Sequence, residues 1–300
     1  MTTECRNIDH FKQLIVYGET LPIVTKFVKS IFAEANIEKA DNIVIYENNG
    51  GYWNKSKEKK PRKLESVVFE KNFVDEIIGD IQEFVDSEEW YTSMGIPYKR
   101  SYLFFGPPGT GKSSLAQAVA AEIKFSICFV NCSDNINDFN FNKLLNTAPK
   151  KSIILVEDVD SIFSERKNAD KNNQMTFSGF LNAIDGVRSQ EGRIIIMTTN
   201  YKERLDPALL RPGRVDEMYE IGLATHYQIE RLCYRFFKDE KLAKEFSQAL
   251  PNGKFSMSMI QGFLLRHRKS PNKIMEKIED LLQSDENVKI EQYLTEIGCQ

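Results

Sequence analysis

Short apolar runs alternate with helical patterns along the middle of the chain, from about residue 65 to residue 222. The runs are YLFF, SICFV, SIILV, RIIIM and MYEI. Between them, apolar residues recur at helical spacing over 112–123, 138–147, 175–185 and 207–210. Unbroken apolar runs are typical of buried parallel strands, which helices join by crossing over a face of the sheet. The pattern predicts an α/β fold with three layers, αβα, around a parallel sheet.

The two ends of the chain carry other patterns. An amphipathic helix is expected near the start, with Thr20 as its cap and one apolar face made of Val24, Phe27, Val28 and Ile31. The stretch GGYWNKSKEKKPRK breaks all periodicity, so we expect a turn and a solvated connector there. From Thr225 onward only helical periods remain, beginning with a capping box of Thr225 and Gln228. Ser270 before Pro271 is expected to open a further helix, whose inward residues are Ile274, Ile278, Leu281 and Leu282.

Composition and charge are those of a soluble, folded protein. Hydrophobic residues make up 41% of the chain, charged residues 28%, and the net charge is −3. This balance excludes a broad positive field that would attract nucleic acid. Five scattered cysteines without a CxxC pair argue against a disulfide framework, and no apolar run approaches the roughly 20 residues of a membrane helix. Acidic residues near the start also argue against a targeting segment, so we expect a soluble, cytoplasmic protein without a transmembrane segment.

The run YLFF leads directly into GPPGTGKSS, and a helical pattern follows. This stretch matches G-x-x-x-x-G-K-[ST] in the required order of strand, loop and helix. Glycines let backbone N–H groups converge on phosphate oxygens at a helix N-terminus, where the helix dipole also favours negative charge. Lys112 would add a charge for the outer phosphates, and the hydroxyl of Ser113 could ligate Mg²⁺. The sequence therefore predicts a site for ATP and Mg²⁺ built from Gly106, Pro107, Pro108, Gly109, Thr110, Gly111, Lys112, Ser113 and Ser114.

Acidic and amide side chains follow two of the other predicted strands. LVEDVD places Glu157, Asp158 and Asp160 at the carboxyl end of its strand, the edge where open α/β sheets bind ligands. By position, we expect Glu157 to hold the metal and Asp158 to orient the water that attacks the γ-phosphate. Asn200 follows the strand IIIMTT and is expected beside the same phosphate.

The ordered set GPPGTGKSS, LVEDVD, MTTN and DPALLRPGRVD resembles the AAA ATPases. The last block is similar to the family's second region of homology. That resemblance implies that Arg211 and Arg214 reach across a subunit boundary to the ATP of a neighbouring chain, and so that the protein forms a homo-oligomer. Guanidinium groups suit this role because they are always charged and bind phosphate oxygens bidentately.

A narrower resemblance covers roughly residues 43 to 280. SVVFEKNFVDEIIGDIQEFV, EWYTSMGIPYKRSYLFF, MTFSGFLNAIDGV and the order Glu157–Asp158 are similar to the BCS-type mitochondrial AAA chaperones of respiratory complex III assembly. The resemblance implies seven-membered rings that move a folded protein cargo, and it allows a mitochondrial association. The membrane anchor of that group is not seen in this sequence.

The segment after SICFV indicates how a cargo would be handled. NCSDNINDFNFNKLL lacks the aromatic-hydrophobic-glycine tripeptide that threading members of the superfamily use, and we expect Phe139 and Phe141 to share one face of a short helix. Two rivals stay open: a nucleic-acid motor that uses the basic run 55–63, with Tyr52 and Trp53 as its stacking aromatics, and a scaffold that binds ATP without hydrolysing it.

These patterns together predict three parts. Residues 1–64 form a reduced, small α+β region, residues 65–222 a P-loop nucleotide-binding subdomain of AAA type, and residues 223–300 a helical lid. We expect an Mg²⁺-dependent ATP hydrolase that acts on a protein partner as a ring.

Overall fold

The chain divides into two compact units. The structure, a computed structural model, describes residues 2–8, 11–17, 20–27, 29, 43–60, 62–132, 136–164, 175–185 and 191–282. The first unit contains 1–42 and 58–61, and the second contains 43–57 and 62–300. In the first unit, β1 (Thr2–Ile8) pairs antiparallel with β2 (Phe11–Tyr17), and residues 21–27 form the helix expected near the start. Val28 and Ile31 of its predicted face lie outside the described residues.

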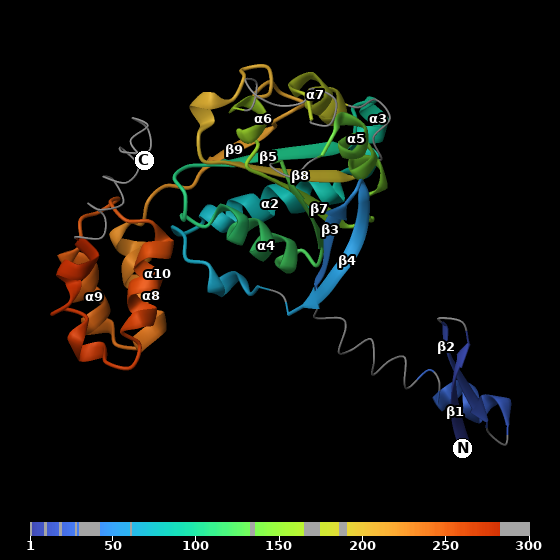
Figure 1. Cartoon of the computed structure of the whole chain (residues 1–300), viewed down its shortest axis with the longest axis horizontal. Helices are drawn as coiled ribbons and strands as arrows, with labels where there is room; N and C mark the ends of the chain where they lie inside the picture. Colours follow the sequence, from blue (N-terminus) through green and yellow to red (C-terminus); the bar gives the residue numbers. More distant parts are fainter. Residues whose placement is uncertain are drawn as a thin grey trace. The chain divides into compact units, whose positions relative to one another are not determined.

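A seven-stranded sheet forms the centre of the second unit (Figure 1). Its order is β4-β3-β6-β7-β8-β5-β9, and every pair with a described register, from β3–β6 to β5–β9, is parallel. The strands are β3 (Ile43–Asn49), β4 (Tyr52–Lys59), β5 (Lys99–Phe105), β6 (Ser126–Asn131), β7 (Ser152–Glu157), β8 (Arg193–Thr199) and β9 (Glu217–Glu220). The predicted α/β fold with a parallel sheet is confirmed.

Helices cover both faces of this sheet and make three layers, as Figure 1 shows. On one face lie α2 (Phe73–Asp86) and α4 (Lys112–Glu122); on the other lie α5 (Asp138–Thr147) and α7 (Phe177–Asp185). Along β7, Ile153 and Leu155 pack towards α2 and α4, whereas Ile154 and Val156 pack towards α5 and α7. Successive strand residues point to opposite faces, so a strand covered on both sides is apolar throughout.

The hairpin β3–β4 extends the sheet, so the interpretation of 50–63 as a solvated connector is wrong for the residues of β4. Gly50 and Gly51 make the turn with φ values of 58° and 82°, and a Cβ on Gly51 would lie 2.6 Å from Asn140 Oδ1. Trp53 Nε1 donates a hydrogen bond of 2.9 Å to the Leu144 carbonyl and ties β4 to α5. Lysines are frequent in edge strands because they discourage pairing with other chains. The lysines of β4 make its sequence resemble a solvated loop, so the apolar pattern did not predict this strand.

Two further expectations are wrong. Residues 207–210 form turns rather than a helix, after the short 3₁₀ segment η2 (Lys202–Arg204). Phe139 and Phe141 do not share a face of α5: Phe141 is buried, while Phe139 is 75% exposed. Residues two apart on a helix do not face the same way, because the helix turns about 100° per residue.

The lid is a separate helical cluster within the second unit. It contains α8 (His226–Phe237), α9 (Glu240–Ala249) and α10 (Met257–Arg266), with the stacked rings of Phe246 and Phe263 in its core at 5.7 Å. The predicted capping box at the start of α8 is present. Ser270–Pro271 opens the 3₁₀ turn η3 (Pro271–Lys273), and residues 278–282 are helical. Of the predicted inward residues, Ile274 and Leu281 are buried, and Ile278 and Leu282 are partly buried against the lid core. The remaining short elements are η1 (Leu64–Ser66), α3 (Glu88–Met94) and α6 (Ser161–Ser164).

Candidate nucleotide-binding site

The loop from β5 to α4 needs glycine at three positions. Gly106, Gly109 and Gly111 have φ values of 137°, 75° and 107°, a region that side chains rarely tolerate. A Cβ on Gly106 would lie only 2.3 Å from the Ile221 carbonyl oxygen. The three residues curl the backbone over the N-terminus of α4, which is the arrangement that anions bind.

Lys112, the first residue of α4, points back into this loop. Its Nζ donates hydrogen bonds to the carbonyl oxygens of Gly106 at 2.7 Å and Pro107 at 2.8 Å, and the residue is only 8% exposed. Burial lowers the pKa of Lys112, while the charges of Asp158 and Asp160 act in the opposite direction. The loop therefore encloses a cation whose present partners are neutral carbonyls that phosphate oxygens can replace.

Ser113 and Glu157 meet directly, although they come from α4 and from the end of β7. The Ser113 hydroxyl donates a hydrogen bond to Glu157 Oε1. A hydroxyl and a carboxylate are oxygen ligands, which Mg²⁺ prefers, and in nucleotide sites this ion takes few protein ligands besides phosphates and water. The pair fits a magnesium ion bound together with a nucleotide.

Asp158 and Asn200 face each other at the same edge of the sheet, since β7 and β8 are neighbours. Asn200 Nδ2 lies 3.5 Å from Asp158 Oδ1, and Asp158 itself has a φ of 51°, unusual for a residue with a side chain. By contrast, Asp160 accepts a hydrogen bond of 2.6 Å from the Thr199 hydroxyl. Asp158 is thus the acid that faces the Asn200 amide, whereas Asp160 is hydrogen-bonded to Thr199 of β8.

The two arginines have different surroundings. Arg211 is exposed, and none of the hydrogen bonds or ion pairs found among the described residues involves its side chain. Arg214 binds Asp185 at the end of α7 bidentately, with Nε 2.8 Å from Oδ1, and also donates to the Ala208 carbonyl at 2.8 Å. This pairing raises the pKa of Arg214 and lowers that of Asp185. The sequence had grouped the two arginines, but in this chain only Arg211 has a side chain available to a neighbour.

A cavity of about 190 Å³ adjoins the phosphate loop and was not predicted. Its walls include Val67 and Phe69 before α2, and Leu232 and Met257 in the lid. Ser258 N donates to the Gly109 carbonyl at 3.0 Å and joins α10 to the loop. These residues are far apart in the sequence and share no local pattern, so only the folded chain could reveal them.

Comparisons with known proteins agree with this geometry. Residues 102–223 match the "ATPase family associated with various cellular activities (AAA)", and residues 226–280 match the "Mitochondrial chaperone BCS1-like, ATPase lid domain". The chain is 45% identical over 252 residues to "Probable mitochondrial chaperone BCS1-A" of Dictyostelium discoideum, covering 79% of this chain and 60% of that protein. It is 40% identical over 251 residues to "Mitochondrial chaperone BCS1" of Homo sapiens, with the same two shares of 79% and 60%.

The chain thus spans about 60% of the length of these relatives. Within the part that the structure describes, no helix is both long and apolar enough to cross a membrane. The phosphate loop, the acids at the sheet edge and the helical lid agree with both matched domains. This chain belongs to the AAA ATPase family and carries a lid of the BCS1-like type.

Proposed function

We propose that the chain hydrolyses ATP with Mg²⁺ as one subunit of a ring, and that this turnover moves a protein partner. The proposal depends on one observation: three sets of polar groups lie at the same edge of the sheet. These are the Lys112 ammonium inside its loop, the Ser113–Glu157 pair and the Asp158–Asn200 pair. Nucleotide, metal and water each have a group of suitable chemistry there.

Binding is assigned to the loop and the cavity beside it. The backbone of Gly106 to Ser114 and the Lys112 ammonium take the phosphates, and the cavity next to Gly109 takes the base. Ser113 and Glu157 hold Mg²⁺, which neutralises charge on the phosphates when bound. Because Lys112 is buried beside Asp158 and Asp160, the phosphates enter a region that contains one cation and several acids, and the metal offsets their repulsion.

Chemistry is assigned to Asp158 and Asn200. The Asp158 carboxylate accepts a proton from the attacking water, and the Asn200 amide fixes the direction of that water. Arg211 is supplied to the ATP of the next subunit, where its guanidinium stabilises the charge that develops on the γ-phosphate. Arg214 stays paired with Asp185 of its own chain and stabilises the turn that contains Arg211.

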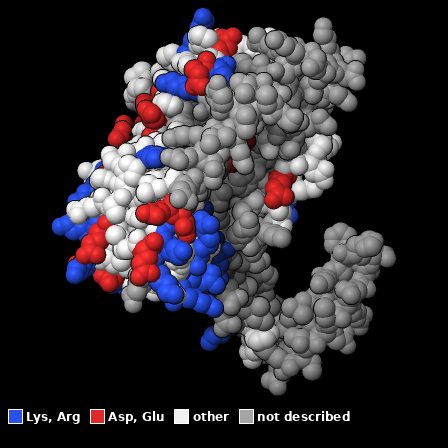
Figure 2. Space-filling model, turned by 60° about the vertical axis from the view of Figure 1, so that its left-hand side comes forward, with Lys and Arg blue, Asp and Glu red and all other residues white. Residues whose placement is uncertain are grey.

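The partner class follows from the relatives. Those named above are mitochondrial chaperones, so we propose a BCS-like chaperone activity, seven subunits and a mitochondrial association for this chain too. The nucleic-acid rival finds less support. On the face in Figure 2, Lys and Arg side chains lie in several patches with Asp and Glu side chains beside them, rather than in a continuous basic track.

The decisive test is ATP turnover by an Asp158→Asn variant. This variant keeps the site's shape but removes the proton acceptor, so we expect it to bind Mg-ATP like the wild type and to hydrolyse it about 10²- to 10⁴-fold more slowly. Asp160→Asn is the matched control and should stay within about tenfold of wild-type turnover, because Asp160 already accepts from Thr199. Glu157→Gln should instead raise the Mg²⁺ concentration needed for half-maximal activity.

Phosphate release and binding of a fluorescent ATP analogue are the two readouts. A wild-type chain that binds the analogue but releases no phosphate would leave only the scaffold function. Wild-type turnover in Asp158→Asn would show that another group activates the water.

A further inference from the structure

Helix α3 carries an apolar face that nothing among the described residues covers. Trp90 is 51% exposed, Met94 59% and Ile96, just past the helix, 46%. Trp90 contacts Tyr91 edge to face, and Tyr91 packs on the buried Phe84 of α2. The exposed Trp90 ring is therefore held in place by packed aromatic side chains. A cluster of large exposed apolar side chains on one short segment is typical of a surface that binds another protein.

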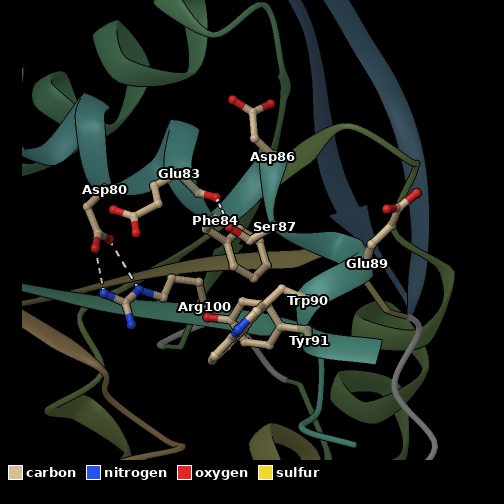
Figure 3. A pocket seen from close by; sticks show the side chains of 9 residues that line it. All are labelled: Asp80, Glu83, Phe84, Asp86, Ser87, Glu89, Trp90, Tyr91 and Arg100. Atoms are coloured by element: carbon tan, nitrogen blue, oxygen red, sulfur yellow. Dashed lines mark hydrogen bonds and ion pairs between the residues drawn. The ribbon is translucent and has the colours of Figure 1, made fainter. Parts of the chain in front are cut away.

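A hollow of about 630 Å³ lies beside this face, between α2 and α3. Figure 3 shows Trp90 and Tyr91 on one side and the pair Asp80–Arg100 on the other. Asp80 is neutralised by Arg100 and also accepts a hydrogen bond of 2.5 Å from the Tyr102 hydroxyl.

The remaining charges of the hollow are all negative. Its wall includes the carboxylates of Glu83, Asp86 and Glu89. The described residues provide no ion pair for any of the three, although Gln82 donates to Asp86 at 3.2 Å. An apolar ring beside uncompensated carboxylates suits a partner that presents an apolar side chain together with arginines or lysines.

The chain carries a segment of this kind at the end of α10. Leu265 is 48% exposed, and Arg266, Arg268 and Lys269 are exposed around it. The segment belongs to the lid, whereas the hollow belongs to the nucleotide-binding part, so the two surfaces are different patches of one molecule. Two different, complementary patches produce a head-to-tail contact between copies, which closes into a ring when the rotation permits.

We propose that residues 265–269 of one copy dock on the α3 face of the next copy, with Leu265 against Trp90 and the basic side chains facing Glu83, Asp86 and Glu89. The proposal rests on the ring assembly proposed above and names surfaces that hold it together. The contact also joins the lid of one subunit to the nucleotide-binding part of another. A movement of the lid in one copy therefore displaces the nucleotide-binding part of its neighbour.

The test is a charge exchange across the contact. Glu83→Lys with Glu89→Lys changes two exposed carboxylates, whose side chains form no hydrogen bond among the described residues. Arg266→Glu with Arg268→Glu changes the other surface. Each pair should raise the protein concentration needed for half-assembly with Mg-ATP, measured by light scattering, about tenfold or more. The two pairs combined in one chain should restore assembly to within a few-fold of the wild type.

The matched control is Glu276→Lys with Glu279→Lys, which makes the same change in net charge at two exposed lid positions that belong to neither surface and should leave assembly unchanged. Binding of a fluorescent ATP analogue reports that each variant is folded. A second signal comes from Trp90, one of only two tryptophans in the chain: its emission should shift to shorter wavelength on assembly. That shift should vanish in Trp90→Phe.

The outcomes separate this proposal from the proposed function. Normal assembly of both charge-reversed pairs, with no shift of Trp90 emission, overturns the contact and leaves the ring intact. A wild-type chain that stays monomeric with Mg-ATP overturns the ring and the contact together. Normal assembly of the Glu83 and Glu89 variant, combined with loss of binding to an Arg-rich peptide, assigns the hollow to a basic cargo and overturns its role between copies.

Discussion

Arg211 and Arg214 are three residues apart, and the structure gives their side chains different surroundings. The bidentate pair with Asp185 holds Arg214 in its own chain, whereas the Arg211 guanidinium is exposed. A side chain already committed to a carboxylate would have to give up that ion pair before reaching another subunit. At the scale of single residues, we therefore propose a rate effect for Arg211 and a structural effect for Arg214.

We predict that Arg211→Ala lowers the turnover number about 10³-fold or more without changing the melting temperature, because it removes only charge stabilisation in the transition state. Arg214→Ala and Asp185→Asn should both lower the melting temperature, and the double variant should lower it no further than the more damaging single variant. Steady-state phosphate release and thermal unfolding measure the two effects.

The Asp185 contribution has a defined pH dependence. Arg214 depresses the pKa of Asp185 in the folded chain, so this stabilisation is present above the unfolded value, about 3.9, and is lost as the pH falls below it. The difference in melting temperature between wild type and Asp185→Asn should be constant from pH 7 to about pH 5 and shrink below about pH 4. A difference that grows on acidification would contradict the pairing.

The motif residues of the site were predictable, and Asp185 was not. Lys112, Ser113, Glu157 and Asn200 lie at or after the carboxyl end of a strand of a parallel sheet, so their order along the chain already places them at one edge. Asp185 ends a helix and meets an arginine from a distant turn, and neither position has a local pattern that indicates the contact. The prediction that both arginines act in trans stays untested, but the free side chain of Arg211 supports it more than the bound one of Arg214.

At the scale of elements, the contact between α10 and the phosphate loop depends on a glycine. Gly109 has a φ of 75°, and a Cβ there would lie 2.3 Å from Ser258 Oγ and 3.0 Å from Ser256 Oγ. Ser256 caps α10, so a displaced serine would disturb the start of that helix. The loop and the lid are thus fitted to each other at this residue.

We predict that Gly109→Ala weakens binding of a fluorescent ATP analogue and lowers stability, by about 1–2 kcal/mol for the backbone conformation alone and more for the steric clash. Adding Ser258→Ala removes the nearest atom and should recover part of the loss. The control is Gly253→Ala, whose φ is also positive, 67°, but where no atom lies within 4 Å of the added Cβ. It should cost stability without changing nucleotide binding; equal binding by Gly109→Ala and wild type would contradict the fit.

The secondary-structure elements differ in how well the sequence predicts them. β5, β6, β7 and β8 are covered on both faces, so their apolar runs are continuous and easily read. β4 lies at the edge of the sheet and is rich in lysine, which resembles a solvated loop. Phe139 shows a different error, since it was expected to share a helix face with Phe141, but Phe141 is buried and Phe139 is exposed.

At the scale of the whole molecule, the site is incomplete without a second copy if Arg211 acts in trans. We predict that Arg211→Ala chains and Lys112→Ala chains, each inactive alone, regain activity when mixed. In a mixed ring, an intact phosphate loop on the first chain lies beside an intact Arg211 on the second, so some sites are whole. Phosphate release by the mixture, compared with each variant alone, measures the effect.

Subunit exchange must be established for this mixture, for example by energy transfer between labelled chains. With exchange established, a mixture no more active than its components would mean that Arg211 serves its own chain. Mixing Arg211→Ala with Asp158→Asn is a second pairing of the same design and should also recover activity.

The hairpin β3–β4 has a consequence for any shortened form of this protein. β6 would become the outermost strand if the first 64 residues were removed, because β3 is its neighbour on that side. Its run Ile127–Val130 would then offer unsatisfied backbone groups to other chains, with no lysines or proline to deter them. A fragment chosen by the apolar pattern alone, starting at residue 65, would therefore tend to aggregate, whereas a fragment that starts at Ile43 keeps β3 and β4 on this edge.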